Sequence, residues 1–395
     1  MKVLTFTTLF PNREQPNNCI FIKNRVAALG RCRDAEVRVV APVPYFPPIP
    51  VQGRWGMAAR MPRQEAVDGL VVSHPRYLVT PKVGMMFYGY WMFLGSLPEM
   101  RKIFREWPFD VIDSHYVYPD GFAAVLLGRH FRRPVAVSAR GTDMNLFPRL
   151  RLIRPLIRKV LRKADQLISV CDPLAELMVE YGGDKTKVAV IPNGVDQSVF
   201  YPMSRRLARR KIGLPEEGGI LLSVGSLIEI KGMHLLLEAL AVLKDKGFLD
   251  FRTFIIGKGP YKSLLERQIA KDDLQSFATL VGEVNNESLG DWYNAADLFI
   301  LGSSSEGWPN VISEALACGT PVISTKVSGI PQIVSSRELG ILSERSPQAF
   351  AGAIREGFER VWNREEISAH GRKRTWQAVA EEIYDIYSMK FKTHR

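Results

Sequence analysis

The sequence is poor in cysteine and histidine. Its 395 residues include four cysteines and six histidines, and no pair of cysteines has the Cys-x-x-Cys spacing. Zinc sites depend on closely spaced cysteine and histidine ligands, so no structural zinc is expected. An acidic metal-binding motif is also missing, which predicts chemistry that needs no metal. Scattered cysteines of this kind are expected to be reduced and mostly buried, as in a cytosolic protein.

Long hydrophobic runs are missing too. The longest stretch without a charged residue, residues 83–98, is shorter than the roughly 20 residues that a spanning helix needs. This stretch is interpreted as either buried core or an interfacial segment. The opening segment, Met1–Phe10, lacks the basic start of a secretory signal and is interpreted as a first strand. A cytoplasmic location is therefore predicted.

Acidic residues are scarce in one half only. Residues 1–200 hold 28 Lys and Arg against 17 Asp and Glu, whereas the rest is nearly balanced within a net charge of +12. An anionic partner is expected for the basic half. No nucleic-acid motif accompanies the charge, so nucleic acid is not expected and a membrane surface is favoured.

The most basic segment, residues 149–163, is amphipathic at helical spacing. One interpretation is a helix packed on its domain with a solvated basic face. The other is peripheral docking on anionic lipid, at the inner face of the plasma membrane.

Apolar, β-rich runs alternate with helical patterns along the whole chain, which predicts an α/β fold with parallel sheets. The sequence predicts two Rossmann-like domains, residues 1–195 and 196–375, facing a central cleft where small ligands often bind. Residues 376–395 are expected to form a helix packing back toward the first domain. The predicted strands are Val3–Thr8, Glu36–Val40, Val111–Ser114, Val135–Ser138, Leu167–Val170, Val188–Ile191, Ile220–Val224, Thr253–Ile256, Ala278–Val281, Leu298–Leu301 and Val322–Ser324.

Two carboxylates mark a candidate ligand site. Glu306 follows the predicted strand Leu298–Leu301, and Glu314 lies in the early turns of the helix that comes next. Open α/β sheets bind ligands at such strand ends, where backbone N–H groups and the helix dipole favour phosphate. Because carboxylates repel phosphate, this pair suits hydroxyl groups, such as those of a sugar and a ribose.

Two glycine-containing segments follow strands in the same way. Gly225 lets the backbone approach a ligand closely, and Lys231 can supply a charge to a diphosphate. Gly257 repeats the strand-to-glycine pattern. Taken alone, the lysine is equally a solvated side chain and the second segment a tight turn.

Together these motifs stand in one order and spacing, and the chain resembles the retaining glycosyltransferases of family 4, which have the GT-B fold. The likeness is closest to bacterial exopolysaccharide and cell-wall polymer enzymes, a finer likeness that rests on Phe10-Pro11, Ile20–Lys23 and Ala41–Pro47. The motifs are Gly-Ser-Leu-x-x-x-Lys-Gly at 225–232, Gly-Lys-Gly-Pro at 257–260, Val-Gly-Glu-Val at 281–284, Glu-Gly-Trp-Pro-Asn-Val-Ile-Ser-Glu-Ala at 306–315, Ala-Cys-Gly-Thr-Pro-Val-Ile at 317–323 and Ser-Gly-Ile-Pro at 328–331.

The resemblance implies transfer of a hexose-type sugar from a nucleoside diphosphate sugar to a glycan or polyprenyl-linked acceptor, without a further cofactor. Glu306 would bind the sugar and face its anomeric carbon, Lys231 would neutralise the diphosphate, and Glu314 would bind the ribose. The other donor-binding residues implied are Gly225, Ser226, Gly257, Glu283, Val284, Gly307, Trp308, Pro309, Asn310 and Val311.

In the first domain, His115, Arg140 and Asp143 follow predicted strands and are the remaining candidate catalytic residues. Relatives often carry histidine where Arg140 stands, so Arg140 is interpreted as a phosphate ligand that Asp143 orients. Asp143 is equally interpreted as a contact for an acceptor hydroxyl, and His115 as a structural histidine. The other departures from the family pattern are Ser226 in place of arginine, Gln332 in place of glutamate, and Asn17-Asn18-Cys19 without the usual glycines.

Two alternatives remain at this point. A sugar-nucleotide epimerase uses the same two-domain plan but needs an acid and a base at the anomeric carbon. A non-catalytic sugar-binding protein would not need the cation placed for a diphosphate.

Overall fold

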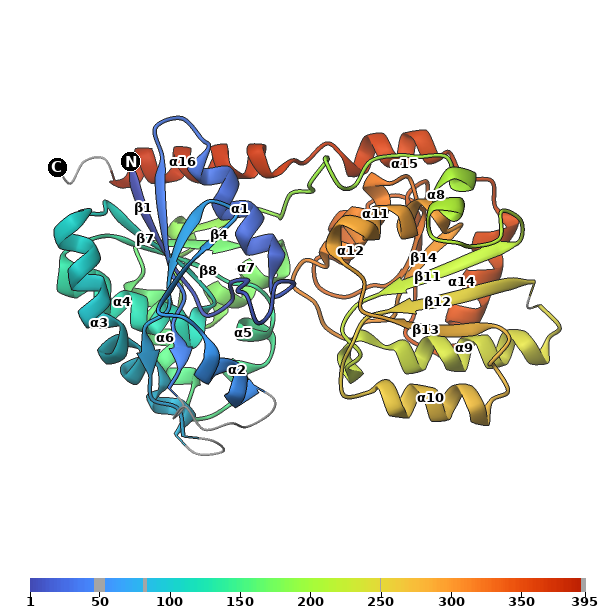
Figure 1. Ribbon diagram of the computed structural model, residues 1–395, viewed down its shortest axis with the longest axis horizontal. Coiled ribbons are helices and arrows are strands. Elements are labelled where there is room, and N and C mark those ends of the chain that lie inside the picture. The colour runs from blue at the N-terminus through green and yellow to red at the C-terminus, as the bar shows by residue number, and fades with distance from the viewer. Residues whose placement is uncertain (46–53, 81–83, 249, 392–395) are drawn as a thin grey trace. The chain divides into compact units, whose positions relative to one another are not determined.

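The computed structural model describes residues 1–45, 54–80, 84–248 and 250–391, and it divides into two compact units (Figure 1). Unit 1 contains Met1–Asn193 and Trp376–Arg395, and unit 2 contains Gly194–Thr375. The sequence placed the corresponding boundaries after residues 195 and 375. Phe46 and Pro47 of the family likeness, Val83 of the uncharged run and residues 392–395 of the predicted last helix lie outside the described residues.

Unit 1 is built on an eight-stranded sheet with the order β10-β9-β8-β7-β1-β2-β5-β4. Its strands pair in parallel, except that β4 and β5 form an antiparallel pair. The central strands are largely buried, as expected when helices cover both faces of a parallel sheet, and they are mostly apolar except for the polar carboxyl end of β7. The strands are β1 Lys2–Phe6, β2 Glu36–Val40, β4 Gln64–Val67, β5 Leu70–Ser73, β7 Val111–His115, β8 Val135–Ser138, β9 Gln166–Ser169 and β10 Val188–Val190, with a separate pair formed by β3 Val43–Pro44 and β6 Arg76–Tyr77.

The last helix of the chain belongs to unit 1. Helix α16, Trp376–Phe391, packs beside α1, Ile20–Gly30, and buries Ile383 and Tyr387 in one apolar cluster with Leu29 (Figure 1). The other helices of this unit are α2 Arg54–Arg60, α3 Tyr88–Glu106, α4 Phe122–Phe131, α5 Thr142–Asn145, α6 Arg154–Lys163 and α7 Asp172–Glu180, with short helical turns at Met85–Phe87, Val117–Gly121, Phe147–Arg149 and Lys185–Lys187.

Unit 2 is built on a six-stranded parallel sheet with the order β13-β12-β11-β14-β15-β16. Two apolar clusters form its core. The strands are β11 Gly219–Val224, β12 Phe251–Ile256, β13 Ala278–Gly282, β14 Leu298–Leu301, β15 Val322–Thr325 and β16 Gly340–Ser343. The helices are α8 Arg205–Lys211, α9 Met233–Asp245, α10 Lys262–Lys271, α11 Asn286–Ala295, α12 Asn310–Ala317, α13 Ile330–Ile333, α14 Pro347–Glu359 and α15 Arg364–Gly371, with a short turn at Glu229–Lys231.

The predicted α/β class with parallel sheets is confirmed. Each predicted strand coincides with an observed strand, with ends that differ by at most two residues. The sequence missed β3, β4, β5, β6 and β16. Of these, β3 and β6 are only two residues long, and β4 carries polar residues that weaken the strand pattern.

The helical pattern at residues 149–163 is only partly correct. The α-helix begins at Arg154, after a short turn at Phe147–Arg149, and Pro155 occupies its first turn. Proline disfavours a helical residue before it and is tolerated in the first turn, which favours a helix start at this point.

The uncharged run has two faces where the structure describes it. Met92 and Ser96 are buried, whereas Phe87, Tyr90 and Leu94 are exposed.

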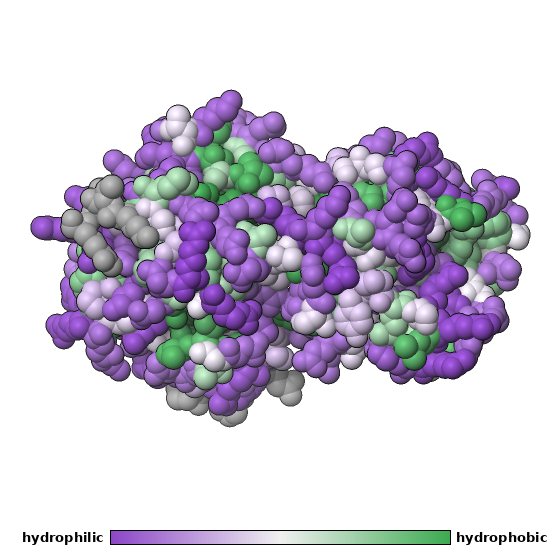
Figure 2. All heavy atoms as spheres, turned by 90° about the horizontal axis from the view of Figure 1, so that it is seen from above, coloured by the Kyte–Doolittle hydropathy of each residue, from purple (hydrophilic) through white to green (hydrophobic). Residues whose placement is uncertain are grey.

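Hydrophilic side chains predominate on the face drawn in Figure 2, and hydrophobic ones gather there only in small groups. Among the described residues, every helix is too short or too polar to cross a membrane.

Candidate active site

The donor-binding residues predicted in unit 2 lie at one edge of its sheet. Strands β13, β12, β11 and β14 are neighbours and parallel, so their carboxyl ends share this edge. Gly225, Ser226 and Lys231 follow β11, Gly257 follows β12, and the remaining residues follow β13 or β14. Glu283 and Val284 come directly after β13, and Gly302–Pro309 connects β14 to α12.

Two glycines allow backbone segments to meet at this edge. A side-chain Cβ on Gly257, whose φ is 146°, would lie 1.9 Å from the carbonyl oxygen of Gly225. A Cβ on Gly232, whose φ is 70°, would lie 2.1 Å from the carbonyl oxygen of Gly302. Only glycine fits such positions. The second contact brings the segment that carries Lys231 against the loop that follows β14.

Lys231 and Glu306 form an ion pair at this junction. Lys231 Nζ lies 2.6 Å from Glu306 Oε1, and the Ser303 hydroxyl donates to the same oxygen at 2.6 Å. The side chains are only 22% and 9% exposed, so solvent weakens their attraction less than at an open surface. The two side chains that the resemblance assigns to the diphosphate and to the sugar are therefore held next to each other.

Helix α12 starts directly after this ion pair. Pro309 is its N-cap and accepts a hydrogen bond from the Ile312 N–H at 3.0 Å. The first N–H groups of any helix lack intrahelical acceptors and favour an anion. Gly307 is fixed by a 3.3 Å hydrogen bond from Gly329, and the indole N–H of Trp308 is buried without a partner. Residues 307–311, which the resemblance assigns to the sugar and its phosphate, thus form the loop end and first turn of this helix.

Glu314 lies on the second turn of α12, as predicted. Its Oε2 accepts a hydrogen bond from the hydroxyl of the fully buried Tyr293 at 3.0 Å. Burial raises the pKa of Glu314 to about 7, although the Tyr293 hydrogen bond lowers it. This carboxyl therefore changes charge near neutral pH.

The other predicted donor residues differ in environment. Ser226 is exposed, and Val284 packs against the apolar core. Glu283 forms an exposed ion pair with Lys258 at 2.5 Å, a contact that the sequence did not indicate. Gln332 is exposed on α13.

The candidate residues of unit 1 also meet at carboxyl strand ends. His115 ends β7, and Arg140 follows the neighbouring strand β8. The Arg140 guanidinium donates to His115 Nδ1, and it donates to Asn193 Oδ1 at 3.2 Å. The two residues are therefore direct partners.

Asp143 holds the backbone at this point. Its carboxylate accepts hydrogen bonds from the N–H groups of Arg140, Gly141 and Val117 at 3.0, 2.8 and 2.9 Å. It thereby joins the loops that follow β7 and β8. Asp143 orients Arg140 through the backbone of that residue, so the predicted partnership takes a different form from a contact with the guanidinium.

Behind His115 lies a buried charge cluster centred on Asp113. Its Oδ1 accepts from Arg25 at 3.2 Å and from the Tyr387 hydroxyl at 2.8 Å, while Oδ2 lies 3.2 Å from His115 Nε2. Burial alone would raise the pKa of Asp113, but Arg25, His115 and Tyr387 outweigh it and keep that pKa low. Asp113 therefore remains a carboxylate.

His115 is neutral in this arrangement. Burial lowers its pKa, Asp113 opposes this, and the charges of Arg140 and Arg25 add to the lowering. Neutral histidine has one donor and one acceptor nitrogen. Nε2 then donates to Asp113 and Nδ1 accepts from Arg140, so both ring nitrogens are occupied. This geometry favours the structural interpretation of His115, with the added task of holding Arg140.

Several residues of the site were missed from the sequence. Arg25 lies between Ile22, Val26 and Leu29 on the buried face of α1, and a charge on an apolar helix face is the signal that indicates it. Tyr387 and Tyr293 carried no such signal, because buried tyrosines are common in helix cores.

Both halves of the chain match family models of glycosyltransferases. The family model "Glycosyltransferase Family 4" matches residues 22–199, and "Glycosyl transferases group 1" matches residues 204–374. The putative teichuronic acid biosynthesis glycosyltransferase TuaC of Bacillus subtilis is 26% identical over 99% of this chain and 95% of its own. A D-inositol 3-phosphate glycosyltransferase of Nocardioides sp. is 30% identical over 71% of this chain and 67% of its own.

The fold of this chain, with its two α/β units, is similar to that of a solved structure. Anabaena HepE in complex with UDP matches with a TM-score of 0.73 over 98% of this chain and 100% of its own. Its sequence identity is 18%, so this likeness concerns the fold alone.

The raised pKa of Glu314 predicts a pH-dependent stability. Between its ordinary pKa of 4.5 and about 7, the folded carboxyl keeps a proton that the unfolded chain has lost. Its contribution to the free energy of unfolding therefore falls as pH rises through this window, by about 3 kcal/mol in full. Glu314→Gln removes this dependence, because an amide does not titrate. Urea unfolding of both chains at about pH 5 and about pH 8 measures it. If the free energies of unfolding of the two chains differed by the same amount at both pH values, the raised pKa of Glu314 would be contradicted.

Proposed function

Because the chain belongs to the group 1 and family 4 glycosyltransferases, we propose that it transfers a sugar from a nucleoside diphosphate sugar with retention at the anomeric carbon. The Lys231–Glu306 ion pair carries this proposal. It places a cation for the diphosphate beside a carboxylate for the sugar, and the start of α12 supplies N–H groups next to both. Glu314, farther along the same helix, binds the ribose hydroxyls.

Catalysis in this proposal rests on charge and position. The departing diphosphate gains negative charge as the sugar leaves, and Lys231 with the N–H groups of α12 stabilises that charge. Glu306 orients the sugar through its hydroxyls. Retention follows from attack on the face that the leaving group departs from, with the leaving phosphate accepting the proton of the acceptor hydroxyl. This route forms no covalent sugar–enzyme intermediate.

The first test identifies the sugar donor and then removes the positive charge of Lys231. Thermal shifts with UDP-, GDP- and ADP-sugars select the donor, with UDP-sugars first because HepE binds UDP. Lys231→Met keeps the side-chain length but loses the charge, so kcat/KM is expected to fall roughly 10²- to 10³-fold. Lys211→Met is the control, since Lys211 pairs with Asp291 at 3.1 Å where α8 ends, before β11 begins.

Three outcomes contradict this proposal. One is equal activity of the Lys231→Met and Lys211→Met chains. Another is an inverted anomeric configuration in the product, measured by NMR. The third is isomerisation of the donor without acceptor, which indicates an epimerase.

Arg140 is proposed to bind a phosphate of the sugar donor, in the place where relatives carry histidine. Burial lowers the pKa of Arg140 to about 9, so the group stays charged at neutral pH. His115 and Asn193 accept hydrogen bonds from its guanidinium, and Asp143 accepts one from its backbone N–H. A charge held in this way needs little reorganisation when it meets an anion.

Replacing Arg140 tests this role. Arg140→Ala is expected to lower kcat/KM by roughly 10²-fold, whereas Arg140→Lys keeps the charge and recovers part of the loss. Tyr387→Phe removes one hydrogen bond from Asp113 and is expected to have a smaller effect on kcat. Melting temperatures of all three chains separate lost chemistry from lost folding. Unchanged kcat/KM in Arg140→Ala would refute the proposed role.

A role in bacterial surface polysaccharide synthesis is the finer part of the proposal. TuaC belongs by its name to teichuronic acid biosynthesis, and the likeness covers nearly the whole chain. A polyprenyl-linked acceptor would lie at a membrane. Leu150 and Leu152 are 42% and 66% exposed beside Arg149 and Arg151, which suits peripheral docking on anionic lipid.

Removing the exposed leucines tests docking without disturbing the core. Leu150→Ser/Leu152→Ser is expected to weaken binding to phosphatidylglycerol vesicles roughly tenfold, because two apolar side chains no longer insert. Leu207→Ser/Leu264→Ser removes two similarly exposed leucines of unit 2 and serves as the control. Co-sedimentation measures the bound fraction. Equal binding by both double variants would exclude this segment as the docking site.

A further inference from the structure

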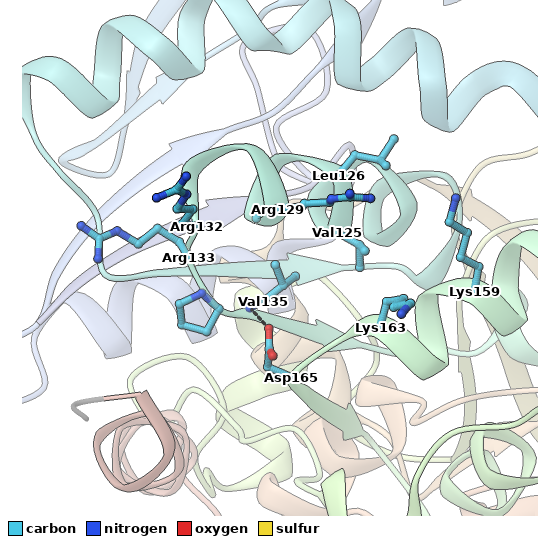
Figure 3. Close-up of a pocket in the computed structure, with 11 residues that line it drawn as sticks. Val125, Leu126, Arg129, Arg132, Arg133, Val135, Lys159, Lys163 and Asp165 are labelled. Atoms are coloured by element: carbon cyan, nitrogen blue, oxygen red, sulfur yellow. Dashed lines mark hydrogen bonds between the residues drawn. The ribbon is translucent and has the colours of Figure 1, made fainter. Parts of the chain in front are cut away.

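A second basic site lies in unit 1 on the opposite edge of the sheet from His115 and Arg140. It is an open pocket of about 400 Å³ between α4 and α6 (Figure 3). Val135 is the first residue of β8, and Asp165 directly precedes β9, so the pocket adjoins the starts of these strands. The candidate active-site residues follow the ends of β7 and β8. The pocket is therefore distinct from that site.

Five cations surround this α4–α6 pocket. They are Arg129, Arg132, Arg133, Lys159 and Lys163, and Val125 and Val135 add apolar lining. Arg132 and Arg133 extend away from Lys159 and Lys163 in the view of Figure 3. Within the described part of the chain, none of the five forms an ion pair with a carboxylate. The acid that lines the pocket, Asp165, accepts the Val135 N–H at 2.9 Å.

Aromatic rings hold two of these cations. Lys159 Nζ lies 5.2 Å from the centre of the Phe122 ring, and Arg133 Cζ lies 5.5 Å from that of Phe104. Such contacts stabilise a cation without neutralising it. The Nε atom of Arg133 is also buried without a hydrogen-bond partner. Part of the cluster is therefore fixed in place and still able to bind an anion.

The ends of α4 and α6 account for only part of this charge. Both helices end at the pocket, and basic residues in a last turn stabilise the helix dipole. Each end contributes about half a negative charge, and Asp165 contributes one more, so about three of the five positive charges remain uncompensated. Four of the five cations are exposed, so water solvates them and they remain available to an anion.

We propose that the α4–α6 pocket binds the phosphate group of a phosphorylated ligand. A phosphate monoester carries up to two negative charges and accepts paired hydrogen bonds from arginine, which suits a cluster of cations that includes arginine and has excess positive charge. The volume lies in the range of small-molecule sites, about 300–1,000 Å³, so it has room for the group that carries the phosphate. A soluble phosphate ester and a phospholipid headgroup share this chemistry.

The test compares two double variants of the full chain. Arg129→Ala/Lys163→Ala removes two exposed cations of the pocket, and Arg31→Ala/Lys185→Ala removes two exposed cations of unit 1 that lie outside it. Both are made in the Lys231→Met chain, so that phosphate binding in unit 2 contributes little. The probes are glycerol 1-phosphate, followed by calorimetry, and vesicles of phosphatidylglycerol or phosphatidylcholine, followed by co-sedimentation.

The pocket variant is expected to lose roughly tenfold or more in affinity, since two charge-assisted contacts to the phosphate are removed. Loss of glycerol 1-phosphate binding, with binding kept in the control, supports a site for soluble esters. If the pocket variant loses binding only to phosphatidylglycerol vesicles, the result supports a lipid headgroup as the ligand. Equal losses in both double variants, or no binding of either probe, overturn the proposal. Glycosyl transfer by the chain with Lys231 intact is measured separately, so a failure here leaves the proposed function standing.

Discussion

The buried carboxylate of Asp113 is the interaction on which unit 1 depends. A charge removed from water is tolerated only when partners replace its solvation, and here Arg25, His115 and Tyr387 do so. These partners come from α1, β7 and α16. The carboxylate therefore ties the last helix of the chain to the first helix and to the central sheet. Through His115, it also sets the direction of the Arg140 guanidinium.

Unit 2 uses charge in a different way. Its sheet brings the ends of adjacent parallel strands to one edge, and Lys231 and Glu306 meet there without full burial. The side chains of this ion pair are 22% and 9% exposed. In unit 1, by contrast, fully buried partners fix the orientation of one cation. The same fold class thus supports one partly exposed and one fully buried charge arrangement.

The excess positive charge of the first 200 residues falls into separate groups. Some cations face carboxylates, as Arg25 faces Asp113, and others lie around the α4–α6 pocket without such partners. Net charge alone therefore says little about a partner. What matters is whether neighbouring groups neutralise each cation, and only the folded chain shows this.

The sequence by itself determined the fold class, most strands, and the placement of Glu306 on a loop and Glu314 on a helix. These features depend on local periodicity and on motifs whose residues are near one another in the chain. Tertiary structure alone decided that Lys231 forms an ion pair with Glu306. It also decided that the Tyr293 hydroxyl donates a hydrogen bond to Glu314 and that the Tyr387 hydroxyl donates one to Asp113. It also showed that Pro155 shortens α6 and that His115 is enclosed. Contacts between residues far apart in sequence depend on how strands are ordered and helices packed, and no local pattern encodes them.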